Sequence, residues 1–397
     1  MSAHSRPGAH VDMVIVGGAM IGAAMARALS GERLALISQD RRPAPAPQGF
    51  DARVYAISPG NAAFLDRLGA WGAIGAERLT PVHAMRVHGD DGASKIEFNA
   101  YRSGASELAW IVEDGRLQDA LWRGMETQAS LSLYAEAPIS ALRIEEKLAG
   151  VELQDGRRLT ARLVVGADGA RSLVRAQACI GSDAQEYGHA AVVANFACER
   201  PHRNIAWQWF LGPSRGGAVL ALLPLPGDHV SMVWSARAAD AARLLALDAA
   251  ALADEVASAA AHALGDLKLA TAARSFRLQR LAAKRLIGPR VALAGDAAHV
   301  IHPLAGQGAN LGLQEVRRLA EVLAARAPGR DPGDFRLLRR YERSRVEPNL
   351  AMRSTVHGLY RLFDAPEPAL GRWRNAGLNL ADRVPVLKNL LMRHAMG

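Results

Sequence analysis

A carboxylate and two imidazole groups lie close together late in the sequence, at Asp296, His299 and His302. Their spacing is compatible with metal ligation, since histidine nitrogens and carboxylate oxygens are common metal ligands. However, Gly295 and Pro303 stand beside them and favour a turn shaped around a flat ring. We therefore predict no metal site, a structural donor role for His299, and a pocket-wall position for His302.

The residues around Asp296 match what an extended organic cofactor needs. The apolar run 291–294 predicts a buried strand that delivers Asp296, whose carboxylate can accept hydrogen bonds from hydroxyl groups. Gly306 and Gly308 allow close approach to a flat ring, and a helix beginning near Ala309 would direct backbone N–H groups at it. The predicted cofactor residues of this segment are Gly295, Asp296, Gly306, Gly308, Ala309 and Asn310.

A second glycine-rich turn lies near the start of the chain. Residues 12–16 predict a buried strand, residues 23–29 a helix of small residues, and residues 33–37 a second strand, as in the βαβ opening of a dinucleotide-binding fold. The turn after the first strand needs small residues because the backbone approaches a pyrophosphate closely and helix N–H groups face it. The predicted cofactor residues of this turn are Gly17, Gly18, Ala19 and Gly22.

Two positions of this opening depart from the usual pattern. Ala19 stands where a glycine is expected, and its methyl group would crowd the pyrophosphate. Ser38 stands where an acid usually binds ribose hydroxyls, and Gln39 and Asp40 follow it. We expect Ser38 or Gln39 to bond a hydroxyl, with Asp40 within reach. The alternative is an ordinary tight strand-to-helix turn.

A third motif lies in the middle of the chain, where a strand over residues 159–165 runs into a Gly-Asp-Gly turn. Asp168 can orient backbone N–H groups there, and Arg171 or Arg175 could face a phosphate. The alternative is a plain Asp-Gly turn with solvent-facing arginines. We count Asp168 among the cofactor residues.

The remaining sequence predicts a mixture of helices and antiparallel strands. Ser58 and Pro59 suit the N-cap and first position of a helix that runs to Leu68. The other expected elements are a helix over 114–128, a hairpin over 139–153, several antiparallel strands over 191–234, an amphipathic helix over 238–264 broken near Asp248, and helices after Gly308 with breaks at 328–333 and 366–368.

Charge and composition exclude several classes of protein. Of 397 residues, 50% are hydrophobic and 22% charged, which is typical of a globular protein. The net charge is +9, and residues 334–397 hold 12 Arg and Lys against 6 Asp and Glu. This excess fits either a solvated Arg-rich surface or a surface drawn to anionic lipid headgroups. No nucleic-acid motif or dense basic run occurs, so nucleic acid is not an expected partner.

The two cysteines and the absence of long apolar runs bear on location. Cys179 and Cys198 belong to no CxxC pair or Cys/His cluster, and we expect reduced, buried thiols. Residues 1–10 lack the apolar core of a signal peptide, and no run reaches 18 apolar residues. We expect a cytoplasmic protein that is not integral to a membrane.

With these motifs in place, the chain resembles the single-component flavoprotein monooxygenases of the aromatic-hydroxylase type, and within them the UbiH/UbiF/VisC group of ubiquinone-biosynthesis hydroxylases. The match covers nearly the whole chain. It includes residues 51–59, 110–113 and 117–118, the Asp168-Gly169 turn, Gly295-Asp296, residues 302–308 and a helical tail. The resemblance implies an FAD cofactor, with Arg53 on the FAD side, Gln118 among the cofactor-binding residues, Asp296 on the ribityl chain and Pro303 beside the oxygen-reactive flavin edge.

The implied fold is α/β. A Rossmann-like FAD-binding domain of the glutathione-reductase type carries an inserted, mostly antiparallel β-sheet substrate domain and a helical C-terminal tail. The FAD-binding domain is expected over residues 11–80, 111–182 and 286–330. The substrate domain is expected over residues 81–110 and 183–285, and the helical C-terminal region over residues 331–397.

The resemblance also implies a reaction. NAD(P)H reduces the flavin transiently, O₂ adds to it, and the flavin hydroperoxide transfers a hydroxyl group to the ring of a polyprenylated phenol in ubiquinone biosynthesis. Pro303 and His302 are the residues expected at the reacting centre. The expected substrate pocket comprises Trp207, Trp209, Leu223 and Pro224, and plain core packing is the alternative for the two tryptophans.

Two other functions stay open. The departures at Ala19 and Ser38 would suit a non-catalytic FAD-fold subunit that scaffolds a quinone-biosynthesis assembly. A monooxygenase of a soluble aromatic compound is the other alternative, although the basic excess of the tail favours a prenylated substrate drawn from a membrane. Peripheral contact with the inner face of the cytoplasmic membrane, or with other quinone-biosynthesis proteins, is therefore expected.

Overall fold

The computed structural model describes residues 9–44, 49–91, 93–212, 217–301 and 307–364. Its helices are α1 (Met20–Ala28), α2 (Pro59–Arg67), α3 (Asp114–Glu126), α4 (Leu173–Gln177), α5 (Ala238–Ala246), α6 (Ala249–Ala259), α7 (Gln307–Ala324) and α8 (Phe335–Asp364). Its strands are β1 (Ala9–Val16), β2 (Leu34–Ile37), β3 (Val54–Ile57), β4 (Thr80–Val82), β5 (Ala84–His88), β6 (Lys95–Asn99), β7 (Ala109–Glu113), β8 (Leu131–Tyr134), β9 (Ile139–Ile144), β10 (Ala149–Leu153), β11 (Arg158–Gly166), β12 (Ser182–Cys198), β13 (Ile205–Phe210), β14 (Val219–Leu225), β15 (His229–Arg237), β16 (Leu267–Leu269), β17 (Arg274–Ala283), β18 (Ile287–Gly288), β19 (Val291–Leu293) and β20 (His299–Val300).

A mostly parallel sheet forms the core of one half of the molecule. Its parallel strands follow the order β19-β11-β1-β2-β8, with β18 at one edge and the β9–β10 hairpin attached to β11. Residues 13–16 of β1 and 163–165 of β11 are apolar and buried, so both faces of the sheet are covered there, and Met13 and Ile15 are fully buried. The predicted βαβ opening and the predicted hairpin over 139–153 are both confirmed.

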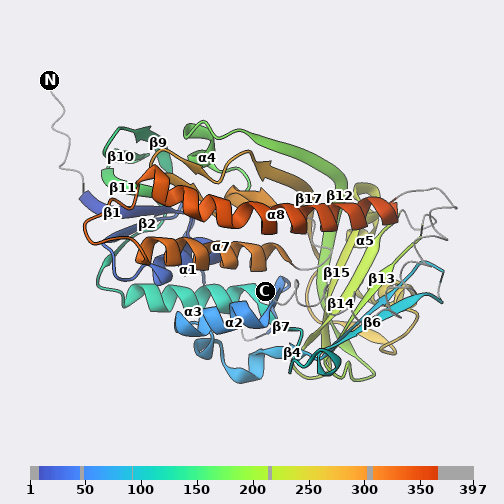
Figure 1. Ribbon diagram of the computed structural model, residues 1–397. Coiled ribbons are helices and arrows are strands. Elements are labelled where there is room, and N and C mark those ends of the chain that lie inside the picture. Colours follow the sequence, from blue (N-terminus) through green and yellow to red (C-terminus); the bar gives the residue numbers. More distant parts are fainter. Residues whose placement is uncertain (1–8, 45–48, 92, 213–216, 302–306, 365–397) are drawn as a thin grey trace.

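Three helices lie together over this sheet. α1 packs between α3 and α7, and α7 packs against α8, which runs along the surface of the molecule (Figure 1). The small residues of α1 permit this close packing, and Ala23, Ala24 and Ala26 are fully buried. A Cβ at Gly312 of α7 would lie 2.6 Å from Cδ1 of Ile21, so α1 and α7 touch at a glycine.

A second sheet fills the other half of the molecule (Figure 1). In the described part of the chain it runs β20-β17-β12-β15-β14-β13-β5-β6, with β16 beside β12. Its pairs are antiparallel except for β13 with β5, which are parallel. Helices α5 and α6 cover one face, and the predicted break near Asp248 is confirmed, since its side chain caps α6 by accepting from Ala251 N at 2.8 Å.

A small sheet, β3-β7-β4, lies between the two large ones (Figure 1). Apolar side chains of β3 pack against the face of the second sheet that α5 and α6 leave open, with Leu223 and Leu225 of β14 in the same cluster. Strand β3 follows directly after Arg53. This sheet therefore places Arg53 between the parallel sheet and the open face of the second sheet.

The α/β fold with a mostly antiparallel second sheet is confirmed, while the domain boundaries stay predictions. One expectation was wrong: Cys179 is exposed rather than buried, and Cys198 is half-buried. Cys179 follows α4 with φ +55°, in an exposed turn. The expected break at 366–368 lies outside the described residues.

Candidate functional site

Asp296 lies after β19 in a one-turn 3-10 helix, η5 (Gly295–Ala297). Gly295 has φ +62°, and a Cβ there would lie 3.0 Å from Cγ1 of Ile21, so glycine is strongly favoured. Gly295, Ala297 and Ala298 are buried, whereas the side chain of Asp296 is exposed. The turn therefore presents one carboxylate from an otherwise buried backbone.

The surroundings of Asp296 are protein rather than bulk water. Burial raises the pKa of Asp296 above its ordinary value, while His299 and Arg53 act to lower it and Glu315 to raise it. Protein atoms therefore surround part of this carboxylate, although solvent still reaches it. We call Asp296 and the charged groups around it, Arg53, His299 and Glu315, the Asp296 site.

Arg53, which directly precedes β3 of the small sheet, belongs to the Asp296 site. Its Nη1 lies 4.0 Å from Oδ2 of Asp114, and its guanidinium carbon lies 5.3 Å from the centre of the Tyr55 ring. Burial acts to lower the pKa of Arg53, but Tyr55, Asp114 and Asp296 outweigh burial, and the pKa is raised. Burial in turn raises the pKa of the Tyr55 hydroxyl well above its ordinary range. The Asp296 site thus contains a half-exposed cation, Arg53, near the carboxylate of Asp296.

Gln118 is one contact away from Arg53. Its Nε2 donates to Oδ1 of Asp114 at 2.7 Å, and Asp114 faces Arg53 through its other oxygen. The structure therefore brings Arg53, Gln118 and Asp296 into one region, although they come from widely separated parts of the sequence.

The glycines of the N-terminal turn are required by close backbone packing. Gly17 has φ +115°, and a Cβ there would lie 2.2 Å from the carbonyl oxygen of Ala167. A Cβ at Gly22 would lie 1.8 Å from the carbonyl oxygen of Gly17. Both positions exclude any side chain, since such distances lie far inside van der Waals contact. These glycines let β1, β11 and α1 meet backbone to backbone.

The N-terminus of α1 is open to a ligand. Ala19 is its exposed N-cap residue, no side chain caps the helix, and its first turn contains no acid. Gly18 lies against Ser38 and Trp122, whose atoms would stand 2.7 Å and 3.0 Å from a Cβ there. Ser38 is buried, and its Oγ accepts from Asp40 N at 3.2 Å. Uncapped N–H groups and the helix dipole make such an end suitable for an anion.

The carboxylate of Asp168 is used within the protein. Its Oδ2 accepts from the backbone N–H groups of Leu173 and Val174 at 2.7 Å and 3.1 Å, as expected of a residue that orients backbone N–H groups. Arg175, one of the two arginines that could face a phosphate, uses its guanidinium within the protein. Its buried guanidinium donates to the carbonyl oxygens of Ala170 and Ala297, because the chain folds it under the Asp296 turn.

Asn310 ties α7 to the start of α2. Its Oδ1 accepts from Ser58 N at 2.8 Å and Asn61 Nδ2 at 2.9 Å, and its Nδ2 donates to the carbonyl oxygen of Ala56. Any cofactor contact from Asn310 would therefore come from its backbone. Ser58 does stand at the N-cap of α2, but its side chain makes no capping bond.

Glu315 is a site residue that the sequence reasoning missed. This fully buried carboxylate on α7 accepts hydrogen bonds from Gly295 N and from Nε2 of His299. The signal was present in the sequence. Glu315 shares the apolar face of its helix with Leu311 and Leu319, one turn away on each side, and a charge on a buried face requires partners. His299 is thereby confirmed as a structural donor.

The expected substrate-pocket residues separate onto two faces of the second sheet. Trp209 belongs to the cluster beneath α5 and α6, and Trp207 packs against this cluster. Leu223 joins the cluster on the opposite face, toward β3, while Pro224 alternates back toward the helices. Of the four residues, only Leu223 lies on the face that packs against β3 and points toward the Asp296 site.

That open face also carries other apolar side chains. Ala221 and Val233 lie beside each other in β14 and β15 and are half-buried. Phe276 of β17 is 41% exposed, and its ring centre lies 5.8 Å from the guanidinium carbon of Arg53. Asn195 of β12 donates to the carbonyl oxygen of Asp51 at 2.8 Å, which fixes this face against the segment that leads to Arg53.

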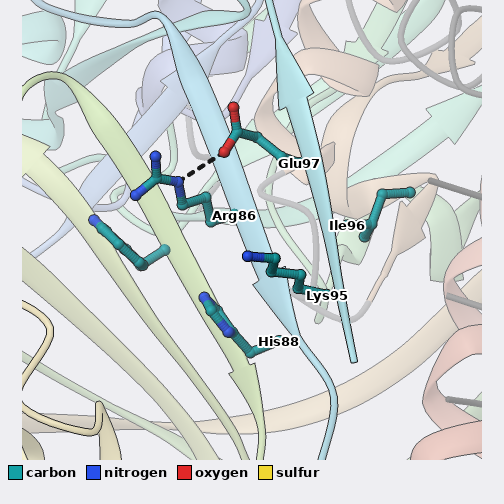
Figure 2. Close-up of a pocket in the computed structure, with 6 residues that line it drawn as sticks. Arg86, His88, Lys95, Ile96 and Glu97 are labelled. Carbon is teal, nitrogen blue, oxygen red and sulfur yellow. Dashed lines mark hydrogen bonds and ion pairs between the residues drawn. The ribbon is translucent and has the colours of Figure 1, made fainter. Parts of the chain in front are cut away.

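A separate pocket of about 220 Å³ lies at the β5–β6 end of the second sheet (Figure 2). Arg86 pairs with Glu97 at 2.8 Å and covers the Trp207 ring, which stacks against His88 at 5.8 Å. Burial, with Lys95 and Arg86, lowers the pKa of His88. No residue of the Asp296 site lines this pocket, so we assign the pocket no part in the cofactor site.

His302, Pro303 and Gly306 lie outside the described residues. Gly308 and Ala309 begin α7 and are half-buried, and a Cβ at Gly308 would make only an ordinary contact with Ile301. Within the described residues, no group of three or more His, Cys, Asp or Glu side chains could hold a metal ion.

Proteins of known family match this chain over most of its length. The sequence profile described as FAD binding domain matches residues 10–353. The ubiquinone hydroxylase UbiL of Rhodospirillum rubrum is 37% identical over 391 residues, covering 97% of this chain and 89% of the relative. The 3-demethoxyubiquinol 3-hydroxylase of Escherichia coli is 35% identical over 392 residues, covering 97% and 98%. The crystal structure of PqsL from Pseudomonas aeruginosa superposes with a TM-score of 0.76 at 25% identity, covering 93% and 99%.

Proposed function

Since this chain belongs to the family of FAD-binding hydroxylases of ubiquinone biosynthesis, we propose that it hydroxylates the aromatic ring of a polyprenylated phenol, with NAD(P)H as transient reductant and O₂ as oxidant. The observation that carries this proposal is the Asp296 site, in which a carboxylate projects from a buried glycine turn and the cation of Arg53 lies near enough to lower its pKa.

The described residues fit FAD, an elongated cofactor with a diphosphate, a polyhydroxyl chain and a flat ring. The uncapped start of α1 suits the diphosphate, because no side chain caps its N–H groups and its first turn contains no acid. The carboxylate of Asp296 suits ribityl hydroxyls as a hydrogen-bond acceptor. When bound, FAD would take a hydride from NAD(P)H and activate O₂ for transfer to the phenol.

The proposed cofactor residues differ in how they act. Gly17, Gly18, Ala19, Gly22 and Gly295 would act through backbone shape, and Asn310, Gly308 and Ala309 through the start of α7. Arg53, Asp296 and Ser38 would act through side chains, whereas Gln118 and Asp168 would hold neighbouring groups in place. His302 and Pro303, which stay predictions, would stand at the reacting centre with Gly306.

The open face of the second sheet is the proposed floor for the phenol. Leu223, Ala221, Val233 and Phe276 form an apolar surface beside Arg53, and apolar walls exclude water from the site of oxygen transfer. Trp207, Trp209 and Pro224 are not retained in this pocket because they lie on the face beneath α5 and α6, or beside it.

We further propose peripheral contact with the inner face of the cytoplasmic membrane through the outer face of α8. Arg336, Arg339, Arg340 and Arg343 are exposed on this helix, and Val346 and Leu350 follow them with exposed fractions of 55% and 57%. Basic and apolar groups on one helix face suit anionic headgroups and the acyl boundary. The described part of the chain contains no helix that is long and apolar enough to span a membrane.

The decisive experiment combines purified protein with complementation. The protein as purified should contain FAD, and a prenylated phenol should stimulate NAD(P)H oxidation and gain one oxygen atom by mass spectrometry. Restored quinone synthesis in a strain that lacks one ring hydroxylase would exclude the scaffold alternative, which Ala19 and Ser38 motivate. Stimulation by soluble aromatic acids but not by prenylated phenols would favour the alternative substrate class. Failure to bind FAD even after reconstitution would overturn the proposal.

A further inference from the structure

Glu315 holds both ends of the segment from which Asp296 projects. Its Oε2 accepts from the backbone N–H of Gly295 at 2.9 Å, and its Oε1 accepts from Nε2 of His299 at 2.7 Å. Gly295 and His299 stand on either side of Asp296 in the sequence. We propose that Glu315 is the positioning residue that sets the orientation of Asp296 toward the cofactor. This inference rests on the proposed contact between Asp296 and FAD.

The long helix α8 anchors Glu315 from the other side. Asn349 Nδ2 donates to Oε1 of Glu315 at 2.8 Å, and Arg345 Nη2 donates to Oδ1 of Asn349 at 3.2 Å. Glu315, Arg345 and Asn349 are all buried. Burial lowers the pKa of Arg345, and the charge of Glu315 acts against this shift. The carboxylate is therefore fixed between α8 and the Asp296 turn rather than free to move with solvent.

A carboxylate is the group that this arrangement requires. Three donors, from Gly295, His299 and Asn349, converge on two oxygens, and an ionised carboxylate only accepts hydrogen bonds. A glutamine of the same size would turn an NH₂ group toward at least one of these donors. His299 is the most dependent partner, because its Nδ1 is buried without a hydrogen-bond partner among the described residues. The orientation of its ring thus depends on Glu315.

The test measures FAD affinity by fluorescence titration of apo-protein, together with the melting temperature of the apo-protein. Glu315→Gln should raise the Kd for FAD about tenfold or more, as expected for loss of charge-assisted hydrogen bonds. Glu321→Gln is the matched control, since Glu321 is an exposed acid on the same helix that pairs with Arg318 at 3.2 Å. The control should leave Kd within about twofold, as usual for surface substitutions.

A double variant separates positioning from a general loss of stability. If Glu315 acts through Asp296, then Glu315→Gln combined with Asp296→Ala should raise Kd no more than about twofold beyond Asp296→Ala alone. Multiplied effects would show that Glu315 acts independently of Asp296 and would overturn the proposal. The proposal also fails if Asp296→Ala weakens FAD binding while Glu315→Gln does not.

Two further outcomes remain distinguishable. If wild type binds FAD and Asp296→Ala keeps full affinity, the proposed role of Asp296 fails, and the Glu315 proposal falls with it. If Glu315→Gln does not fold, His299→Gln and Asn349→Ala each remove one partner of Glu315 and should each raise Kd about threefold, from partial loss of the same contacts. Unchanged Kd in both of these variants would overturn the proposal.

Discussion

The N-terminal turn and the Asp296 turn are both proposed to bind the cofactor, but they are held in shape by different contacts. Each follows a parallel strand, and each begins with a glycine of positive φ, +115° at Gly17 and +62° at Gly295. The N-terminal turn is shaped by backbone contact, since a Cβ at Gly17 would stand 2.2 Å from a carbonyl oxygen. The Asp296 turn is shaped by side chains, since Glu315 and Arg175 bind its backbone from below.

The difference follows from the ligand groups that each turn would meet. A diphosphate needs N–H donors and closeness, which a bare backbone and a helix start provide. Ribityl hydroxyls need an acceptor at a defined position, and a side chain provides this only if its own backbone is fixed. The first turn should therefore fail through steric overlap, and the second through loss of a specific polar contact.

The largest expected effect is on the backbone-built turn. Gly17→Ala should lower the free energy of unfolding by at least about 3 kcal/mol, from the disfavoured φ together with overlap with the carbonyl of Ala167. Urea denaturation followed by circular dichroism measures this change. Gly31→Ala is the matched control, because nothing lies within 4 Å of a Cβ there. Equal stability of the two variants would break the argument that packing requires Gly17.

Next in size is the effect on the side-chain-built turn. Asp296→Ala should weaken FAD binding by about a hundredfold, the loss expected for hydrogen bonds to a charged group. The apo-protein should keep its fold, because burial already disfavours this carboxylate. Fluorescence titration and a thermal melt measure the two quantities. Asp40→Ala removes an exposed acid after β2 and should change Kd less than about threefold. A larger effect there would move the ribose contact to Asp40.

The same two turns show which features of the site could be predicted from the sequence. Strands, glycine turns and the position of Asp296 were predictable because they depend on local patterns of apolar and small residues. The residues that bind the backbone of the Asp296 turn were not, since Glu315 and Arg175 act across the fold. The apolar face of α7 indicates that Glu315 needs buried partners, but it does not identify them. The faces of Trp207 and Trp209 were equally hidden. Strand alternation separates two faces, but only the packing of α5 and α6 tells which face is covered.

A third prediction concerns pH and applies to the Asp296 turn alone. The raised pKa means that the folded apo-protein holds the Asp296 proton more tightly than the unfolded chain does. The wild type should therefore lose stability relative to Asp296→Asn as the pH rises from the ordinary pKa of 3.8 through the folded value. Well below pH 3.8, Asp296 is protonated in both the folded and the unfolded wild type. The stability difference between wild type and Asp296→Asn should therefore be constant there. Urea denaturation of both apo-proteins across this range is the measurement, and a difference independent of pH would contradict it.

The smallest expected effect tests the departure at Ala19, in the turn that has no ionisable side chain between Gly17 and Gly22. Ala19 is the exposed N-cap of α1, and glycine is preferred to alanine at this position. Ala19→Gly should stabilise the protein by about 0.5 kcal/mol and should tighten FAD binding by up to about threefold, because the methyl group no longer crowds the diphosphate. Both changes should be independent of pH across the range in which Asp296 loses its proton, because this turn contains no group that titrates there. Weaker FAD binding in this variant would show that the methyl group packs against the cofactor, and the N-terminal turn would then also use a side chain.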